Sequence, residues 1–118
     1  MVSRDLGKVL VIVPTYNERE SLPVIVSGIR QAEPGIHILI ADDNSPDGTG
    51  EVADGLSSSD NSVHVLHRSA KAGLGAAYLD AFNWAKSNGY DVVVEMDADG
   101  SHRPQDLTKI LDALTNND

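Results

Sequence analysis

The stretch that decides the fold is Lys8-Val9-Leu10-Val11-Ile12-Val13, followed at once by Pro14. A nearly unbroken run of apolar, mostly β-branched side chains is typical of a strand buried on both faces of a parallel sheet. Proline cannot donate a hydrogen bond to a neighbouring strand, so we expect the strand to stop there and residues 14–18 to form a loop. The sequence therefore predicts a buried strand that leads into a polar loop.

Three further apolar runs predict strands, at residues 36–41, 63–66 and 91–96. A helical pattern follows each of the four strands, and no hairpin signal joins any two of them. Connections of this length join parallel strands by right-handed crossovers. We therefore predict one α/β domain over residues 1–118, with an open, doubly wound, mainly parallel sheet in the strand order 3-2-1-4.

The helical segments are amphipathic, with apolar residues recurring every three or four positions. We expect Ser21 to be the N-cap of the first helix. The second is weakened by two glycines, and a solvated loop is expected at residues 57–61. Packing roles are expected for the larger side chains of the last two helices: Tyr78, Phe82, Trp84, Leu107, Ile110, Leu111 and Leu114.

Polar residues follow three of the predicted strands. In the order 3-2-1-4 the first and fourth strands are neighbours at the topological switch point, and ligands bind outside the carboxyl ends of the strands there. Residues 14–18, the pair Asp42-Asp43 and the segment Asp97-Ala98-Asp99 are therefore expected to flank one crevice.

Asp97 and Asp99 are two positions apart directly after a strand, so both carboxylates can converge on one cation. Oxygen ligands suit a hard metal such as Mg²⁺ or Mn²⁺. The alternative is turn chemistry, because Asp and Gly often end strands simply by turning the chain. The predicted position at the switch point favours the metal site. His102 is a candidate third ligand or acid–base group, with a role outside the site as its alternative.

Asp42 and Asp43 should point to different sides of a strand end, so one can face the crevice while the other caps the turn. We expect Asp43 to face a ligand and accept hydrogen bonds from a base or ribose. For Asp47 a turn-capping role is favoured. Tyr16 lies off any apolar face, and its ring can pack against a nucleotide base; the alternative is a partly buried loop tyrosine.

A weaker candidate is Lys71-Ala72-Gly73-Leu74-Gly75, where a lysine near a helix N-terminus can meet a phosphate. It lacks the P-loop pattern, and no Gly-x-Gly-x-x-Gly follows the first strand. The sequence therefore supports neither a P-loop ATPase nor a dinucleotide dehydrogenase. No Ser–His–Asp set or nucleophile is readable, and His37, His64 and His67 show no partner pattern.

Composition excludes several classes of protein. The net charge of −9, from 18 acidic and 9 basic residues, argues against a nucleic-acid-binding surface. A phosphorylated ligand would need a metal or local basic groups to offset this charge. No apolar run approaches the ~20 residues that span a bilayer, and no signal-peptide profile is present. We expect a cytoplasmic location, at the cytoplasmic face of a membrane in a full-length protein, and the lack of cysteine excludes disulfides.

These pieces together resemble family 2 glycosyltransferases with the A-type fold, and among them polyprenol- or dolichol-phosphate mannose synthases. The resemblance covers nearly the whole chain in order. It is carried by Val13-Pro14-Thr15-Tyr16-Asn17-Glu18, Asp42-Asp43-Asn44-Ser45-Pro46-Asp47-Gly48-Thr49, Leu66-His67-Arg68 with Lys71-Ala72-Gly73-Leu74-Gly75, Ala77-Tyr78, Gly89-Tyr90-Asp91, and Glu95-Met96-Asp97-Ala98-Asp99-Gly100-Ser101-His102.

The resemblance implies inverting transfer of mannose from GDP-mannose to a polyprenyl (dolichyl) phosphate, dependent on Mg²⁺ or Mn²⁺. It matches Pro14, Tyr16 and Glu18 to nucleotide-binding positions, and places Ala41 and Asp43 beside the base and ribose. It assigns Asp97, Ala98 and Asp99 to the diphosphate and metal, with Asp99 the most direct ligand. Ser101 stands where some relatives have a metal-binding Gln, so its shorter side chain makes direct ligation doubtful.

The resemblance also implies a longer enzyme. This chain would supply the donor-binding part, inactive alone, whether it is a piece of such an enzyme or a short natural protein. The acceptor site and the membrane contact would belong to the missing part. We expect the fourth strand to be an exposed edge through which copies self-associate. Two alternatives stay open: a related transferase using a UDP-sugar and a hydroxyl acceptor, and a non-catalytic nucleotide- or metal-binding module.

Overall fold

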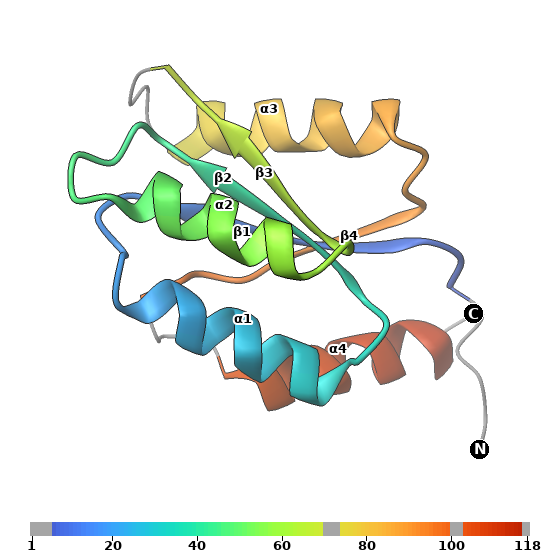
Figure 1. Cartoon of the computed structure of the whole chain (residues 1–118). Helices are drawn as coiled ribbons and strands as arrows, with labels where there is room; N and C mark the ends of the chain where they lie inside the picture. The colour runs from blue at the N-terminus through green and yellow to red at the C-terminus, as the bar shows by residue number, and fades with distance from the viewer. Residues whose placement is uncertain (1–5, 70–73, 100–102, 117–118) are drawn as a thin grey trace.

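The computed structural model describes residues 6–69, 74–99 and 103–116, where four strands alternate with four helices (Figure 1). The strands are β1 (Val9–Thr15), β2 (His37–Asp42), β3 (Val63–His67) and β4 (Val92–Glu95). The helices are α1 (Ser21–Ala32), α2 (Thr49–Ser59), α3 (Leu74–Ser87) and α4 (Pro104–Asn116).

The four strands form one parallel sheet in the order β3-β2-β1-β4, which confirms the predicted fold class and strand order. β1 is central, since Leu10 is in register with His37 of β2 on one side and with Val93 of β4 on the other. The switch point therefore lies between β1 and β4, and the loops after these strands meet at one end of the sheet.

Alternation along the central strands divides the core into two layers. Val11 and Val13 of β1 pack in the layer beneath α1, α2 and α4, whereas Leu10 and Ile12 pack in the layer beneath α3. Figure 1 shows α3 alone on one face of the sheet and the other three helices on the opposite face. Burial on both faces explains why β1 has no exposed polar face in its sequence.

The predicted end of the first strand was wrong, because β1 continues through Pro14 to Thr15. The carbonyl of Ile12 accepts a hydrogen bond from the Met96 amide. The backbone N–H and C=O groups of the even-numbered residues of β1 therefore point toward β4. β4 ends at Glu95, and the proline nitrogen therefore points to a place where the strand pairing has already finished. Pro14 costs the sheet no hydrogen bond there, and Thr15 still binds the β2 side through the Asp43 amide.

Two predictions about helix ends were also wrong. The loop expected from residue 57 belongs to α2 as far as Ser59, and the Ser58 and Ser59 hydroxyls donate to carbonyls one turn earlier. Ser21 is the first residue of α1 rather than its cap, and its hydroxyl donates to the Glu18 carbonyl at 3.4 Å. Both errors concern serines whose hydroxyls bond to nearby backbone.

The outer apolar residues are less buried than their helical pattern predicts. Leu107 and Leu111 are buried, but Ile110 and Leu114 of α4 and Phe82 of α3 are more than 40% exposed. β4 is confirmed as an edge strand, paired only with β1 among the described residues. None of the helices in the described ranges is long and apolar enough to cross a membrane.

Candidate nucleotide and metal site

A pocket of about 310 Å³ opens at the carboxyl ends of β1 and β4. It is lined by Pro14, Thr15, Tyr16, Glu18, Asp43, Ala77, Asp97, Ala98 and Asp99. The lining combines the end of β1 with the loop after it, the residue after β2, the segment after β4 and Ala77 of α3. Parallel strands bring their carboxyl ends to one edge of the sheet, which explains why these segments meet. The predicted crevice is therefore confirmed as a physical pocket.

Seven of the residues predicted to bind donor or metal line this pocket: Pro14, Tyr16, Glu18, Asp43, Asp97, Ala98 and Asp99. Ala41 lies elsewhere. It is 1% exposed and packs in the core layer beneath α3, a position that favours packing over side-chain contact with a ligand. Lys71, Ser101 and His102 lie outside the described residues, so the roles suggested for them stay predictions.

The adjacent carboxylates at the end of β2 point in different directions, as expected. Asp42 turns inward, where its Oδ1 accepts from Thr15 Oγ1 at 2.7 Å and from Ser45 Oγ at 2.6 Å. Its Oδ2 accepts from the Ser45 amide at 3.1 Å, so Asp42 fixes the turn. Asp43 lines the pocket instead, which agrees with its predicted direction.

Arg68 does not line the pocket but pairs with Asp43, which does, and the sequence analysis gave it no role. Its guanidinium forms a buried ion pair with Asp43, and both side chains are under 10% exposed. Its Nε also donates to Asp80 of α3 at 3.0 Å. These hydrogen bonds, first that to Asp80 and then that to Asp43, raise the pKa of Arg68. The available signal was a lone arginine after a strand in a strongly acidic chain, within the Leu66-His67-Arg68 stretch.

Burial and neighbouring carboxylates raise the cost of ionising Glu18 in the pocket. The pKa of Glu18 is raised, first by burial and then by the negative charges of Asp99, Asp97 and Asp47, against a lowering by the Tyr16 amide. A bound cation would relieve this repulsion.

The described residues contain no group of three His, Cys, Asp or Glu side chains placed to hold a metal. Asp97 and Asp99 nevertheless supply the hard oxygen donors that Mg²⁺ and Mn²⁺ accept. Mg²⁺ in particular is often held by one or two carboxylates, with phosphate oxygens of a ligand and water completing its shell. The donor set therefore fits a cation that binds together with a diphosphate.

Two tyrosines border the site differently. Tyr16 is 37% exposed at the pocket, where its ring is accessible to a flat partner. Tyr78 packs in α3, with its ring centroid 6.1 Å from that of Phe82, which confirms its expected packing role. Burial, followed by the nearby carboxylates of Glu95 and Asp97, raises the pKa of Tyr78. The Tyr78 hydroxyl therefore stays protonated beside the acidic segment.

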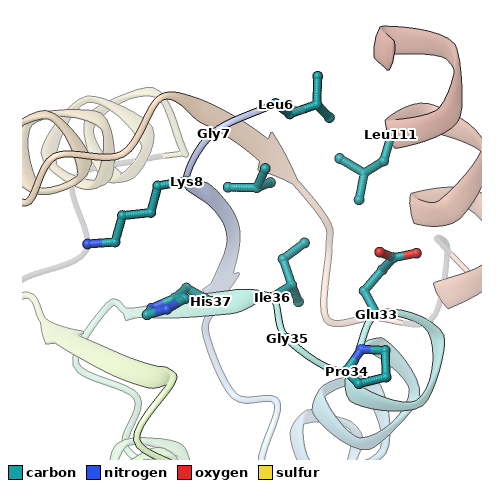
Figure 2. A pocket seen from close by; sticks show the side chains of 10 residues that line it. Leu6, Gly7, Lys8, Glu33, Pro34, Gly35, Ile36, His37 and Leu111 are labelled. Atoms are coloured by element: carbon teal, nitrogen blue, oxygen red, sulfur yellow. The ribbon is translucent and has the colours of Figure 1, made fainter. Parts of the chain in front are cut away.

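A second pocket, of about 410 Å³, lies at the opposite end of the sheet (Figure 2). Figure 2 shows Leu6, Ile36 and Leu111 directed toward its middle, whereas the Lys8 side chain extends away. The Lys8 Nζ lies 4.4 Å from the centroid of the Tyr90 ring. Its polar side chains already have partners within the protein: Glu33 accepts from Thr108 Oγ1 at 3.0 Å and His37 lies 2.8 Å from the Tyr90 hydroxyl, so it is a weaker candidate site.

The histidines have partners that the sequence pattern did not reveal. His37 Nδ1 lies 3.2 Å from His64 Nε2 and 2.8 Å from the Tyr90 hydroxyl. His67 Nε2 lies 2.8 Å from Asp54 Oδ1. None of these three histidines lines the acidic pocket, so they contribute to packing and not to the candidate site.

The family model for glycosyl transferase family 2 matches residues 10–118. The chain belongs to this family. Over 112 residues it is 58% identical to the polyprenol monophosphomannose synthase of Mycolicibacterium smegmatis, a match that covers 94% of this chain and 42% of that protein. Over 107 residues it is 55% identical to the undecaprenyl-phosphate mannosyltransferase of Micrococcus luteus, covering 91% and 44%. The chain thus spans less than half the length of these relatives.

The fold is also found in solved glycosyltransferases. A mannosyltransferase of Pyrobaculum calidifontis, solved in complex with GDP-Man and Mn²⁺, superimposes with a TM-score of 0.70 and 24% identity. The match covers 79% of this chain and 28% of that one. At this identity the likeness speaks for the fold, and it confirms the expected A-type architecture.

Proposed function

We propose that this chain is the donor-binding part of an enzyme that transfers mannose from GDP-mannose to a polyprenyl (dolichyl) phosphate. The observation that carries the proposal is the pocket that brings Tyr16, Asp43, Asp97 and Asp99 together at the switch point of the sheet. The names of its 55–58% identical relatives support the sugar and the class of acceptor.

Each side of the pocket suits one part of the donor. Tyr16 offers a ring face to the base, and Asp43 accepts hydrogen bonds from the nucleoside while Arg68 fixes its orientation. Asp97 and Asp99 would hold Mg²⁺ or Mn²⁺ beside the diphosphate. When bound, such a cation offsets the charge that develops on the departing diphosphate.

The proposed acceptor explains why no general base is evident. A polyprenyl phosphate is already anionic, so its oxygen can attack the anomeric carbon of mannose without giving up a proton. The bond from that carbon to GDP breaks as the new bond forms, and the configuration at the carbon is inverted. We expect the acceptor site and the membrane contact, at the cytoplasmic face, in the part of such enzymes beyond the segment matched here. The 118 residues alone should then bind donor without turning it over.

Calorimetry of the 118-residue chain with GDP, UDP and GDP-mannose, each with and without Mn²⁺, tests the proposal. We expect GDP and GDP-mannose to bind, to gain affinity when Mn²⁺ is present, and to be preferred over UDP. A preference for UDP would contradict the proposed donor while leaving a transferase domain. No metal-dependent gain with any nucleotide would refute the metal-dependent transferase proposal.

A further inference from the structure

Three consecutive backbone amides of the loop after β1 donate hydrogen bonds to side chains of the segment between β2 and α2, including the first residue of α2. The bonds are Asn17 N to Ser45 Oγ at 2.9 Å, Glu18 N to Thr49 Oγ1 at 3.0 Å and Arg19 N to Asp47 Oδ2 at 3.3 Å. The first loop carries Tyr16 and Glu18 of the pocket, whereas none of the three acceptor residues lines it. We call Ser45, Asp47 and Thr49 the polar clamp.

Both hydroxyls of the polar clamp are forced to accept from the backbone. A hydroxyl has one hydrogen, and a carboxylate can only accept. Ser45 Oγ donates its hydrogen to Asp42 Oδ1 at 2.6 Å, and Thr49 Oγ1 donates its own to Asp47 Oδ1. Only lone pairs then remain to face the amides of Asn17 and Glu18, so each carboxylate fixes the direction of one hydroxyl.

Burial and backbone geometry indicate that these contacts determine the loop conformation. Thr49 is 0% exposed and Asp42 is 2% exposed, so water competes little at these two side chains, whereas the hydrogen bonds from the Asn17 and Arg19 amides lie at the exposed edge of the clamp. Asn17 and Asn44 have φ values of 56° and 57°, in the left-handed region that non-glycine residues occupy infrequently. Such residues persist where surrounding contacts hold them, and here one lies in each of the joined loops.

We propose that the polar clamp is a set of positioning residues that holds Tyr16 and Glu18 in their binding geometry before a nucleotide arrives. The inference rests on the proposed function, because positioning matters only if the pocket binds a ligand. The conformational entropy of the loop is then lost on folding instead of on binding, which leaves more of the contact energy as affinity. The clamp residues act without touching the nucleotide.

The first test measures the clamp without any ligand. Thr49→Val keeps the shape of the side chain but removes the acceptor, so amide hydrogen exchange at Glu18 should accelerate. Thr49→Ser restores a hydroxyl and should restore protection. Thr108→Val is the matched control, since Thr108 Oγ1 donates to Glu33 Oε2 at 3.0 Å away from the pocket. Unchanged exchange at Glu18 in Thr49→Val would show that the clamp does not hold the loop.

The second test asks whether the polar clamp increases nucleotide affinity, by calorimetry of the same variants with GDP and Mn²⁺. Thr49→Val should weaken binding about three- to tenfold, the range expected for one buried hydrogen bond, whereas Thr49→Ser and Thr108→Val should bind as the original chain does. Faster exchange with unchanged affinity would refute the positioning role. If the unchanged chain binds no nucleotide, the proposed function and the positioning role fail together, while the exchange data still decide whether the clamp exists.

Thr49→Val could fail to fold, since the site is fully buried. Ser45→Ala provides the second variant, because Ser45 is only partly buried and its loss affects the Asn17 amide. Faster exchange at Asn17 with weaker GDP binding supports the inference in that variant. Unchanged exchange and affinity in Ser45→Ala would overturn it for this half of the clamp.

Discussion

The two ends of the sheet hold their polar side chains in opposite ways. At the carboxyl end, Glu18 shares a pocket with Asp97 and Asp99, and their negative charges add to burial in raising the pKa of Glu18. These groups repel one another, which disfavours the folded state.

At the amino end, polar groups satisfy one another. The Tyr90 hydroxyl lies 2.8 Å from His37 Nδ1 and 3.4 Å from His64 Nε2, and the Trp84 ring packs beside both His64 and Tyr90. At the carboxyl end of the sheet, carboxylates therefore lie close enough to repel one another, and a cation would relieve this repulsion. At the amino end, the polar side chains pack and hydrogen-bond with one another. The difference teaches that local repulsion distinguishes the end of the sheet proposed to bind a ligand better than pocket size does.

The largest expected effect comes from Asp99→Ala. We expect it to remove the gain in GDP affinity caused by Mn²⁺, to within about twofold of the metal-free value, because the proposed cation loses a ligand. Calorimetry with and without Mn²⁺ measures this gain. Asp112→Ala, on α4 outside the pocket, serves as the control. An undiminished gain in Asp99→Ala would refute the ligand assignment.

Arg68→Met should lower the free energy of unfolding by about 3 kcal/mol, since it leaves the Asp43 carboxylate buried without its cation. Urea unfolding measures the loss. Arg103→Met is the control, because Arg103 and Asp106 form an exposed ion pair 3.5 Å apart, and exposed pairs contribute little to stability in water.

Adding Asp43→Asn to Arg68→Met should recover part of the stability, since it removes the stranded charge. Equal stability of Arg68→Met and the original chain would mean that the buried ion pair does not support this wall of the pocket.

Acid should destabilise the packing of His37 and His64 at the amino end of the sheet. Burial, followed by His64, Lys8 and Arg30, lowers the pKa of His37, while Asp60 opposes the shift. Burial and Lys8 likewise lower the pKa of His64.

The unfolded chain therefore binds protons at these histidines at a higher pH than the folded chain does. The contribution of the two neutral histidines to the free energy of unfolding should be intact above about pH 6.5, the ordinary pKa of histidine. It should decline as the pH falls below that value. His64→Gln should flatten the stability profile between pH 7 and pH 5 in urea unfolding. An identical slope in His64→Gln would contradict this assignment.

The smallest expected effect concerns the edge strand. We predict weak self-association through β4, whose outer side pairs with no other strand in the described chain. Sedimentation at high protein concentration measures it, and Val92→Lys should reduce it by placing a charge on the edge. Val24→Lys, at a side chain 72% exposed on α1, is the control. A purely monomeric original chain at high concentration would contradict the prediction.

Periodicity and chain order were sufficient to predict the sheet, its strand order and the crevice, because buried apolar runs and crossover connections leave few alternatives. The end of β1 was not predictable in this way. A proline such as Pro14 ends a strand only where the neighbouring strand offers a carbonyl that needs an N–H donor. Because β4 ends at Glu95, no strand carbonyl lies opposite the Pro14 nitrogen. Similarly, Asp97 and Asp99 could be placed from their position after a strand, whereas the partnership of Arg68 with Asp43 spans 25 residues and has no local signal.

The polar clamp has a further consequence for the order in which the pocket is built. All of its contacts lie within residues 17–49, in the first β-α-β unit and the start of α2, while Asp97 and Asp99 follow only after β4. The wall proposed to bind the base is therefore held by contacts within the first half of the chain, whereas the wall proposed to bind the metal exists only once β4 has joined β1 in the sheet.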